Sequence, residues 1–290
     1  MLSVIIPCFN SERSLPQLLK SIKIQDLSCV QLIFVDNGST DSTAQILKRF
    51  CCNQPGSHYL YYDDVPSSYA ARNYGVLHSI YNFLLFIDSD CILSENFICN
   101  YKSIIRSIDS NSVICGDVKF SFINPGYPNF FELYDSHFFL SQSAYASNKL
   151  CATANFGTSK SIFTSLNGFS ILSTGSDHDF CRRLSSLENS FIFSKKCFVI
   201  HPARNTFNQI IFKIKRLSYG RFLRSSKSTS FNEFLSFLPL KIFFKIYQLK
   251  LPFYTSIPLF LVAIFFNVIS RSYFFYFYFR SFIGLPFHVR

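Results

Sequence analysis

The sequence predicts an α/β fold in which a mostly parallel sheet has helices on both faces. The first observation is that, over residues 1–110, short apolar runs alternate with segments whose apolar residues recur at helical spacing. That order implies parallel strands joined by right-handed crossovers. The second is a more irregular order after residue 110, as expected of a substrate-binding region. The third is a C-terminal third that is both basic and apolar, which predicts a separate helical region.

Each predicted element of the first half follows from a local pattern. Four apolar runs predict strands, at 2–6, 30–35, 58–62 and 83–87. Apolar residues three or four positions apart predict helices between and after these strands, at 15–22, 44–51, 68–80 and 97–108. Ser94 fits the N-cap position of the last helix.

The second half is predicted to hold more varied elements. They are a long strand at 113–122, an aromatic-rich helix at 130–139, a short helix within 157–168, a helix at 176–188, and small strands at 191–193 and 197–200.

Two acids, Asp88 and Asp90, stop the fourth apolar run. In open α/β sheets, ligands bind at the carboxyl ends of the strands. Alternate residues of an extended segment share a face, so the two carboxylates point the same way. They are hard oxygen ligands that suit Mg²⁺ or Mn²⁺, and such a metal would serve a phosphate-bearing substrate. The sequence does not choose between the two ions.

The net charge of +11 is concentrated in the last third of the chain. Residues 1–203 hold 15 Lys and Arg against 16 Asp and Glu, so they net −1, whereas residues 204–290 hold 13 against 1 and net +12. This break predicts a boundary between an N-terminal domain, 1–203, and a C-terminal region, 204–290. Within the first domain, the change of pattern near residue 110 separates two halves, 1–110 and 111–203.

The ten cysteines are scattered, with no Cys-x-x-Cys pair. Several lie inside apolar, strand-like runs, and the first strand begins at residue 2, with no secretory signal before it. We therefore expect reduced, mostly buried thiols in a cytosolic compartment, with a zinc site or a disulfide framework as the alternative.

Five short motifs occur in order along residues 1–203. They are Val4–Asn10, Ile33–Asp41, the Ala-Arg-Asn-Tyr-Gly of Ala71–Gly75, the triplet Asp88–Asp90, and Gly175–Arg183. Their order and spacing together resemble family 2 glycosyltransferases. The resemblance implies the GT-A fold, a Rossmann-like sheet, with a nucleotide-sugar-binding half at 1–110 and an acceptor-side half at 111–203.

This sequence departs from the family pattern at two positions. Asn37 stands where an Asp-Asp-Gly-Ser motif has its second acid, and Ser176 replaces the Glu of a Glu-Asp pair. Two acids of these motifs remain. Asp36 is the first acid of the motif that would bind the uridine, and Asp177 is the acid that the resemblance implies to be the general base.

The resemblance implies a role for each motif residue. The donor-binding residues would be Pro7, Phe9, Asn10, Glu12, Asp36, Arg72, Asp88 and Ser89. Asp36 would bind the nucleotide base, and Asp88 would hold the ribose or a metal-bound water. A guanidinium such as that of Arg72 can clamp a diphosphate through two parallel hydrogen bonds. The plainer alternatives are a turn-forming Asp36 and a solvated Arg72.

The remaining assignments concern the metal and the acceptor. Asp90 would bind the metal directly and His201 would be a further ligand, although a lone His after a strand is usually structural. Asp177 is the candidate general base, which takes the proton of an acceptor hydroxyl in a single inverting displacement. Asp179 and Asn155 are placed on the acceptor side. The alternative for Asp179 is an acid at a helix N-terminus, where the helix dipole favours it. The alternative for Asn155 is a role in a backbone turn.

The C-terminal third predicts contact with a membrane. Residues 251–270 carry no charge, and about 20 residues at 1.5 Å each span roughly one 30 Å hydrocarbon core. The assignment of a membrane span is weakened by Pro252, Pro258 and Asn267. The segment 272–279 is aromatic enough to lie in the interface between membrane and water. Residues 207–250 mix apolar with nine basic residues, typical of an interfacial amphipathic region. Helices packed on the catalytic domain, or pairing with another chain, are the alternative.

The sequence therefore predicts a metal-dependent inverting glycosyltransferase, held at the cytoplasmic face of a membrane. It would use a nucleotide-sugar donor and a lipid-linked or polysaccharide acceptor, in cell-surface polysaccharide or glycolipid synthesis. Nucleic acid is a poor alternative partner, because the basic region is too apolar for a free arm. The other readings are a membrane-associated nucleotide-sugar-binding protein without turnover, and a nucleotidyltransferase, which lacks the expected glycine- and lysine-rich first loop.

Overall fold

The computed structural model describes residues 1–109, 111–172, 174–185, 190–224, 242, 246–247, 249 and 253–282. The chain divides into two compact units. The first comprises Met1–Ser121, Leu140–Leu172 and Ser176–Pro202, and the second comprises Phe122–Phe139, Ser173–Gly175 and Ala203–Arg290. The aromatic segment expected in the acceptor-side half thus belongs to the second unit.

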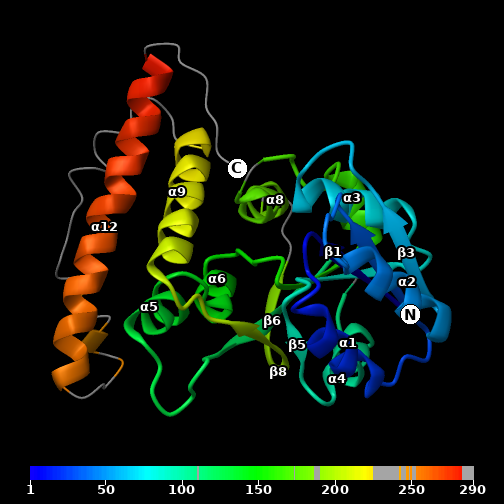
Figure 1. Cartoon of the computed structure of the whole chain (residues 1–290). Helices are drawn as coiled ribbons and strands as arrows, with labels where there is room; N and C mark the ends of the chain where they lie inside the picture. Colours follow the sequence, from blue (N-terminus) through cyan, green and yellow to red (C-terminus); the bar gives the residue numbers. More distant parts are fainter. Residues whose placement is uncertain are drawn as a thin grey trace. The chain divides into compact units, whose positions relative to one another are not determined.

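The first unit is built on one sheet (Figure 1). Its strands are β1 (Leu2–Cys8), β2 (Val30–Asp36), β3 (Ser57–Tyr61), β4 (Phe83–Ile87), β5 (Ile92–Leu93), β6 (Val113–Ser121), β7 (Asn155–Ser159) and β8 (Phe191–Pro202). Within the described residues their order is β3-β2-β1-β4-β7-β6-β8-β5. The expected strands are present, and β5 and β7 are additional.

The sheet is mixed: among the described residues, four of its seven strand pairings are parallel and three are antiparallel. β3, β2, β1 and β4 pair in parallel, as the alternating pattern predicted. β7 then runs antiparallel to both β4 and β6, and the short β5 runs antiparallel to β8, while β6 and β8 are parallel. The antiparallel strands follow loops and helices of irregular order, which the alternation rule does not cover.

Two sequence predictions for the second half need correction. Asn155, for which a backbone turn was the alternative, lies in the strand β7, and the short helix expected within 157–168 begins only at Lys160. The two small strands form one strand, β8, whose pairing with β6 shifts between Gly116 and Asp117. The residues between Ser194 and Phe198 lie at this irregularity. They include the polar residues that made the sequence appear to hold two separate strands.

Helices cover both faces of the sheet, as predicted. They are α1 (Leu15–Lys23), α2 (Thr43–Asn53), α3 (Ser68–Leu77), α4 (Phe97–Ile105), α6 (Gln142–Ser147), α7 (Lys160–Ser165) and α8 (Ser176–Ser185). Alternate strand residues divide the core: Val4 and Ile6 pack with α1, α2 and α4, whereas Ile5 packs with α3, α7 and α8. The predicted extension of α8 to residue 188 lies outside the described residues.

α3 approaches the sheet closely at Gly75. A Cβ atom at this position would lie 2.7 Å from Cγ2 of Ile5 and 3.1 Å from Cγ2 of Val35, so only glycine fits without a shift of the core. The Ser67 side chain caps the start of the helix by accepting hydrogen bonds from the backbone of Tyr69 and Ala70. Both features fix the register of the helix that carries Tyr69 and Arg72.

The second unit contains α5 (Phe130–Phe138), α9 (Phe207–Arg224) and α12 (Phe253–Phe282). The three helices share an apolar cluster that includes Tyr134, Ile210 and Phe266. A buried ion pair also joins α5 to α9, because Lys213 Nζ lies 2.8 Å from Oδ1 of the fully buried Asp135. The backbone N–H of Arg204 donates to the other oxygen of Asp135 at 3.0 Å.

One helix among the described residues, Thr255–Ser281 within α12, is long and apolar enough to cross a bilayer, judged by length and composition alone. Its mean hydropathy is 1.7, and 22% of the tested window is buried inside the protein. This helix overlaps the charge-free segment 251–270, of which residues 251 and 252 lie outside the described part of the chain.

Candidate active site

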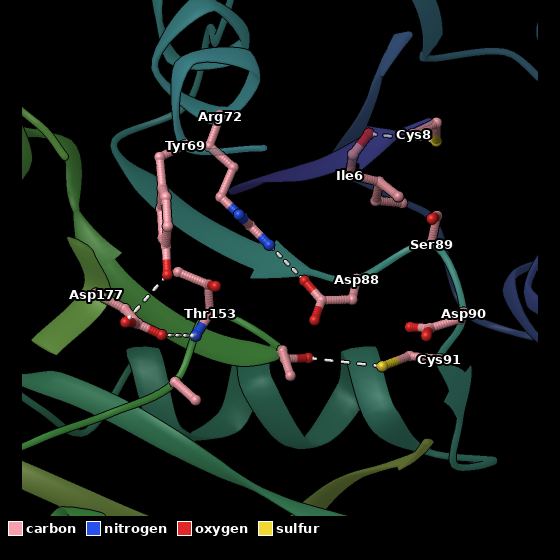
Figure 2. Close-up of polar contacts among 12 residues, drawn as sticks. Ile6, Cys8, Tyr69, Arg72, Asp88, Ser89, Asp90, Cys91, Thr153 and Asp177 are labelled. Atoms are coloured by element: carbon pink, nitrogen blue, oxygen red, sulfur yellow. Dashed lines mark hydrogen bonds and ion pairs between the residues drawn. The ribbon is translucent and has the colours of Figure 1, made fainter. Parts of the chain in front are cut away.

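The candidate site lies at the carboxyl ends of β1, β2 and β4. Cys8 at the end of β1 pairs with Asp36 at the end of β2, and β4 on the other side of β1 ends at Ile87, directly before the Asp88–Asp90 triplet. Three loops that are distant in sequence therefore meet at one edge of the sheet. Figure 2 shows the side chains that α3, α8 and the loop after β4 bring together there.

The loop after β1 is tied to the loop after β2. Asn10 has a positive φ of 47°, and its Oδ1 accepts a hydrogen bond from the Thr40 backbone N–H at 2.8 Å. Oε2 of Glu12 accepts one from the Ser42 backbone N–H at 3.1 Å. Pro7 is buried within β1, whereas Phe9, just beyond it, is 61% exposed. Asn10 and Glu12 thus shape the rim, and Phe9 presents an open ring at it.

Asp36 is fully buried at the end of β2. Its Oδ1 accepts the Ser39 backbone N–H and its Oδ2 accepts the Tyr59 hydroxyl, each at 3.0 Å. Burial, together with the negative charge of Asp36, raises the pKa of Tyr59 to about 12, so that this hydroxyl stays a donor. Asp36 is therefore held in one orientation as an acceptor, and Tyr59 is a supporting residue that the sequence did not indicate.

Asn37 has a structural use that an aspartate could not serve. Its Nδ2 donates to the carbonyl oxygens of Tyr62 and Val65 at 2.8 and 3.0 Å, closing the 62–65 loop onto the end of β2. A carboxylate has no proton for either bond. Ser176 likewise fits its own site: it is fully buried, and its Oγ accepts the Leu172 backbone N–H at 3.2 Å.

Arg72 is buried rather than solvated, since only 3% of it is exposed. Its Nη2 forms an ion pair with Asp88 Oδ1, drawn as a dashed line in Figure 2. Its Nε is buried and has no hydrogen-bond partner among the described residues. A buried guanidinium with an unused donor is suited to an anionic ligand, because a further acceptor would satisfy it.

β8 brings a third side chain with a ligand atom suited to a metal, that of His201, to Asp88 and Asp90 in the loop after β4. One ligand atom from each of Asp88, Asp90 and His201 lies within 4.8 Å of the others. His201, in β8, has its Nδ1 2.8 Å from the carbonyl of Pro202. If Nδ1 carries the proton, Nε2 presents a lone pair toward Asp90, the tautomer that a metal ligand requires. Two carboxylates and an imidazole fit a divalent cation.

Ser89, the middle residue of the triplet, links it to the loop after β1. Its Oγ lies 2.9 Å from Oγ of Ser11, and the Ser11 backbone N–H in turn donates to Oγ1 of the buried Thr43 at 2.7 Å. Ser89 is therefore engaged by the scaffold in this structure.

Asp177 lies in the first turn of α8. Its Oδ1 accepts hydrogen bonds from the Tyr69 hydroxyl at 3.1 Å and from the His178 backbone N–H at 2.9 Å. Oδ2 lies 3.4 Å from the backbone nitrogen of Thr153. Figure 2 shows that Tyr69 and Arg72 descend from the same helix, the first toward Asp177 and the second toward Asp88.

Asp179 and Asn155 are engaged inside the scaffold. Oδ2 of Asp179 accepts the Ser170 hydroxyl at 2.6 Å and Nε of Arg183 at 3.1 Å. Asn155 is fully buried; it accepts the Tyr101 hydroxyl at 2.6 Å and donates to the carbonyl oxygens of Asp117 and Cys197, both at 2.9 Å. Asn155 thus joins β7 to its neighbours and has a structural role in the sheet.

The sequence alone did not indicate Tyr69, which contacts the candidate base. A signal was available, because Tyr69 precedes Arg72 by three positions and so shares its helix face. Thr153 could not have been found in this way, since it is 24 residues from Asp177 and acts through its backbone.

Comparison with known proteins agrees with this geometry. Residues 3–166 match the family described as glycosyl transferase family 2. The chain therefore belongs to this family, as its motifs predicted. It is 28% identical to the glycosyltransferase AglE of Haloferax volcanii over 223 residues, which cover 76% of this chain and 72% of AglE. It is 33% identical over 119 residues to a PGL/p-HBAD biosynthesis glycosyltransferase of Mycobacterium bovis, covering 41% and 46% of the two chains.

Solved structures share the fold at low sequence identity. The mannosyltransferase PcManGT of Pyrobaculum calidifontis, in complex with GDP-Man and Mn²⁺, has a TM-score of 0.57 at 16% identity, covering 78% of this chain and 65% of its own. Residues 1–349 of S. aureus TarS, in complex with UDP-GlcNAc, have a TM-score of 0.56 at 17% identity, covering 99% and 93%. The protein is accordingly a glycosyltransferase with a mixed α/β fold like theirs.

Proposed function

We propose that this protein is a metal-dependent, inverting glycosyltransferase that moves a sugar from a nucleoside-diphosphate sugar to a hydroxyl acceptor. The observation that carries the proposal is the cluster of Asp88, Asp90 and His201 beside the buried Arg72. The site thus offers ligands for a divalent cation and a guanidinium for a diphosphate. The complexes of the fold relatives with UDP-GlcNAc or with GDP-Man and Mn²⁺ support the same donor class.

Each of the named residues would serve one part of the donor. Asp36 would accept a hydrogen bond from the nucleotide base, and Phe9 and Asn10 would line the rim around it. Arg72 would bind a diphosphate oxygen through its unused Nε. When bound at Asp88, Asp90 and His201, a divalent cation would offset the charge on the departing nucleoside diphosphate. The imidazole in this set favours Mn²⁺ over Mg²⁺, because Mg²⁺ prefers oxygen ligands alone.

Asp177 would act as the general base. The proton of the acceptor hydroxyl moves to Asp177 as the acceptor oxygen bonds to the anomeric carbon. The bond from that carbon to the diphosphate oxygen breaks, and its electron pair leaves with the nucleoside diphosphate. One displacement inverts the anomeric centre. Asp179 would support this region through Arg183 rather than touch the acceptor.

We further propose that the second unit attaches the enzyme to the cytoplasmic face of a membrane. Along α12, exposed apolar side chains recur on one helix face; they are Ile257, Leu261, Phe265, Val268, Tyr276 and Phe279. The opposite face, including Leu259, Ala263 and Phe266, is buried against the apolar cluster of the unit. The charge of +12 in 204–290 would attract anionic lipids, and basic residues beside a span favour the cytoplasmic side. The acceptor would then be lipid-linked or a polysaccharide.

A nucleotide-sugar-binding protein without turnover is less well supported. The departures that suggested it, Asn37 and Ser176, are both explained by hydrogen bonds that these residues form within the scaffold. Neither one removes a candidate catalytic group.

The experiment measures release of nucleoside diphosphate from UDP-GlcNAc and from GDP-Man, with MnCl₂ and with excess chelator. We expect release by the wild type only with the metal, and none by Asp90→Ala. Asp26→Ala is the matched control, because Asp26 is an exposed acid paired with Lys102. Donor binding without release would favour the non-catalytic reading, and pyrophosphate in place of nucleoside diphosphate would reveal a nucleotidyltransferase.

A further inference from the structure

Tyr69 connects the two halves of the candidate site. It lies on α3, one turn before Arg72, and only 8% of it is exposed. Its hydroxyl donates to Asp177 Oδ1 at 3.1 Å, and the guanidinium carbon of Arg72 lies 5.4 Å from its ring centroid. Arg72 in turn pairs with Asp88. Figure 2 marks the contact of Tyr69 with Asp177 and that of Arg72 with Asp88 by dashed lines.

We propose that Tyr69 is a positioning residue that holds Asp177 with its Oδ2 directed to the acceptor hydroxyl. This inference rests on the proposed function, since it takes Asp177 as the general base. Tyr69 lies outside the five family motifs. The oxygen of Asp177 that would receive the proton is Oδ2.

The two oxygens of Asp177 are engaged unequally. Oδ1 accepts two hydrogen bonds of ordinary length, from the Tyr69 hydroxyl and from the His178 backbone N–H. Among the residues that the structure describes, Oδ2 has only the backbone N–H of Thr153, whose nitrogen lies 3.4 Å away, beyond the usual range of 2.7–3.2 Å for such bonds. Oδ2 therefore keeps more capacity to accept, and the acceptor's proton would move to it.

The surroundings of Tyr69 fix the direction of its hydroxyl. Its ring contacts the ring of Phe169, with centroids 5.7 Å apart, and lies beside the Arg72 guanidinium. The cap at Ser67 and the close approach at Gly75 set the helix register from which the ring projects. These contacts involve the ring, whereas the bond to Asp177 involves only the hydroxyl. Tyr69→Phe thus removes the hydroxyl that donates to Asp177 and keeps the ring that makes these packing contacts.

Arg72 also strengthens the hydrogen bond from the Tyr69 hydroxyl to Asp177. A cation near an aromatic face is attracted to the electrons of the ring. That attraction makes the hydroxyl of the same ring a stronger donor to the carboxylate. The residue proposed to bind the diphosphate thereby supports the placement of the base.

The test compares Tyr69→Phe with the wild type in release of nucleoside diphosphate from UDP-GlcNAc and from GDP-Man with MnCl₂, with water or an alkyl glycoside as hydroxyl acceptor. We expect kcat to fall about ten- to hundred-fold, the range for a lost hydrogen bond to a charged group, while the donor KM and the melting temperature stay unchanged. Tyr74→Phe is the matched control on the same helix, where the ring stacks on Tyr62 with centroids 4.8 Å apart. It should retain the wild-type kcat.

A double-mutant cycle with Asp177→Asn isolates the proposed coupling. If Tyr69 acts through the base, Tyr69→Phe has no further effect on single-turnover release once Asp177 is Asn. An equal fall in both backgrounds, or an unchanged kcat in Tyr69→Phe alone, overturns the inference. Failure of the proposed function is distinguishable, because the wild type itself would then release no nucleoside diphosphate, and the inference would fall with it.

Discussion

His201 Nε2 lies 3.5 Å from Asp90 Oδ2, although 111 positions separate the two residues. The contact exists because β8 returns alongside β6 and brings its last residues to the loop after β4. The Pro202 carbonyl, 2.8 Å from Nδ1, favours the tautomer that leaves Nε2 free to bind a metal. This pair defines the side of the site at which we propose that the metal binds.

We predict that His201→Ala weakens Mn²⁺ binding on the order of ten-fold or more, because one of three protein ligands is lost. Calorimetric titration with MnCl₂ in the presence of UDP measures this change. His78→Ala, at the exposed residue that follows α3, is the control and should bind Mn²⁺ like the wild type. Equal affinity in His201→Ala would show that His201 is a structural residue.

We predict that Asp177→Asn preserves donor binding and lowers turnover by on the order of 10²-fold or more, as expected for a lost general base. The amide is nearly isosteric but lacks the basic oxygen, so the loss should appear in kcat rather than in affinity. Nucleotide titration and single-turnover release measure the two quantities separately. Wild-type turnover in this variant would place the base elsewhere.

We predict that Asn37→Asp destabilises the protein by about 2–4 kcal/mol, because two carbonyl oxygens lose their donor and face a carboxylate instead. Chemical denaturation measures the free energy of unfolding. Asn82→Asp, at an exposed position, is the matched control and should change it by less than about 0.5 kcal/mol. A stable Asn37→Asp protein would remove our explanation of the departure from the family motif.

We predict a pH dependence of stability from the buried pair in the second unit. Burial, with the nearby charge of Arg204, lowers the pKa of Lys213 from 10.5 to about 8 despite the opposing charge of Asp135. Between about pH 8 and 10.5 the unfolded state therefore binds more protons at Lys213 than the folded state. The free energy of unfolding should rise with pH there, by up to about 1.4 kcal/mol per unit.

The variant Lys213→Met isolates this contribution, because it cannot titrate at this position. The free energy of unfolding of the wild type, measured in detergent, should increase relative to the variant across that window. A constant difference between the two proteins from pH 8 to 10.5 would contradict the assigned shift.

We predict that the full-length protein remains in the membrane pellet after a carbonate wash, which removes peripheral proteins. The exposed apolar face of α12 would supply a part of the membrane binding that does not depend on charge and therefore resists the wash. Recovery in the soluble fraction without detergent would instead favour a packing or oligomer role for the second unit.

The sequence predicted the first half of the fold well because each parallel strand is a buried apolar run that needs no partner information to recognise. Leu84 and Phe86 face one layer of helices and Leu85 and Ile87 the other, so the whole run is apolar. It predicted β7 poorly. Asn155, Gly157 and Thr158 are polar or small, and they are buried only because neighbouring strands and Tyr101 satisfy them.

The motifs located most of the candidate site, since the ends of parallel strands must meet at one edge. Contacts between distant segments were beyond the sequence. The hydroxyl of Tyr59 on Asp36 and that of Tyr69 on Asp177 depend on packing across the sheet and between helices. The burial of Arg72 is of the same kind, because it arises from the pairing with Asp88 rather than from any local pattern.

The central claim is that Asp88, Asp90 and His201 hold a metal for sugar transfer from a nucleotide donor. Its most direct test is release of nucleoside diphosphate from UDP-GlcNAc or GDP-Man by the full-length protein, titrated with MnCl₂ after removal of metal by a chelator. We expect release to rise from zero to saturation with Mn²⁺ in the wild type and to stay at zero in Asp90→Ala. Undiminished release in excess chelator, or by a folded Asp90→Ala protein, would contradict the claim.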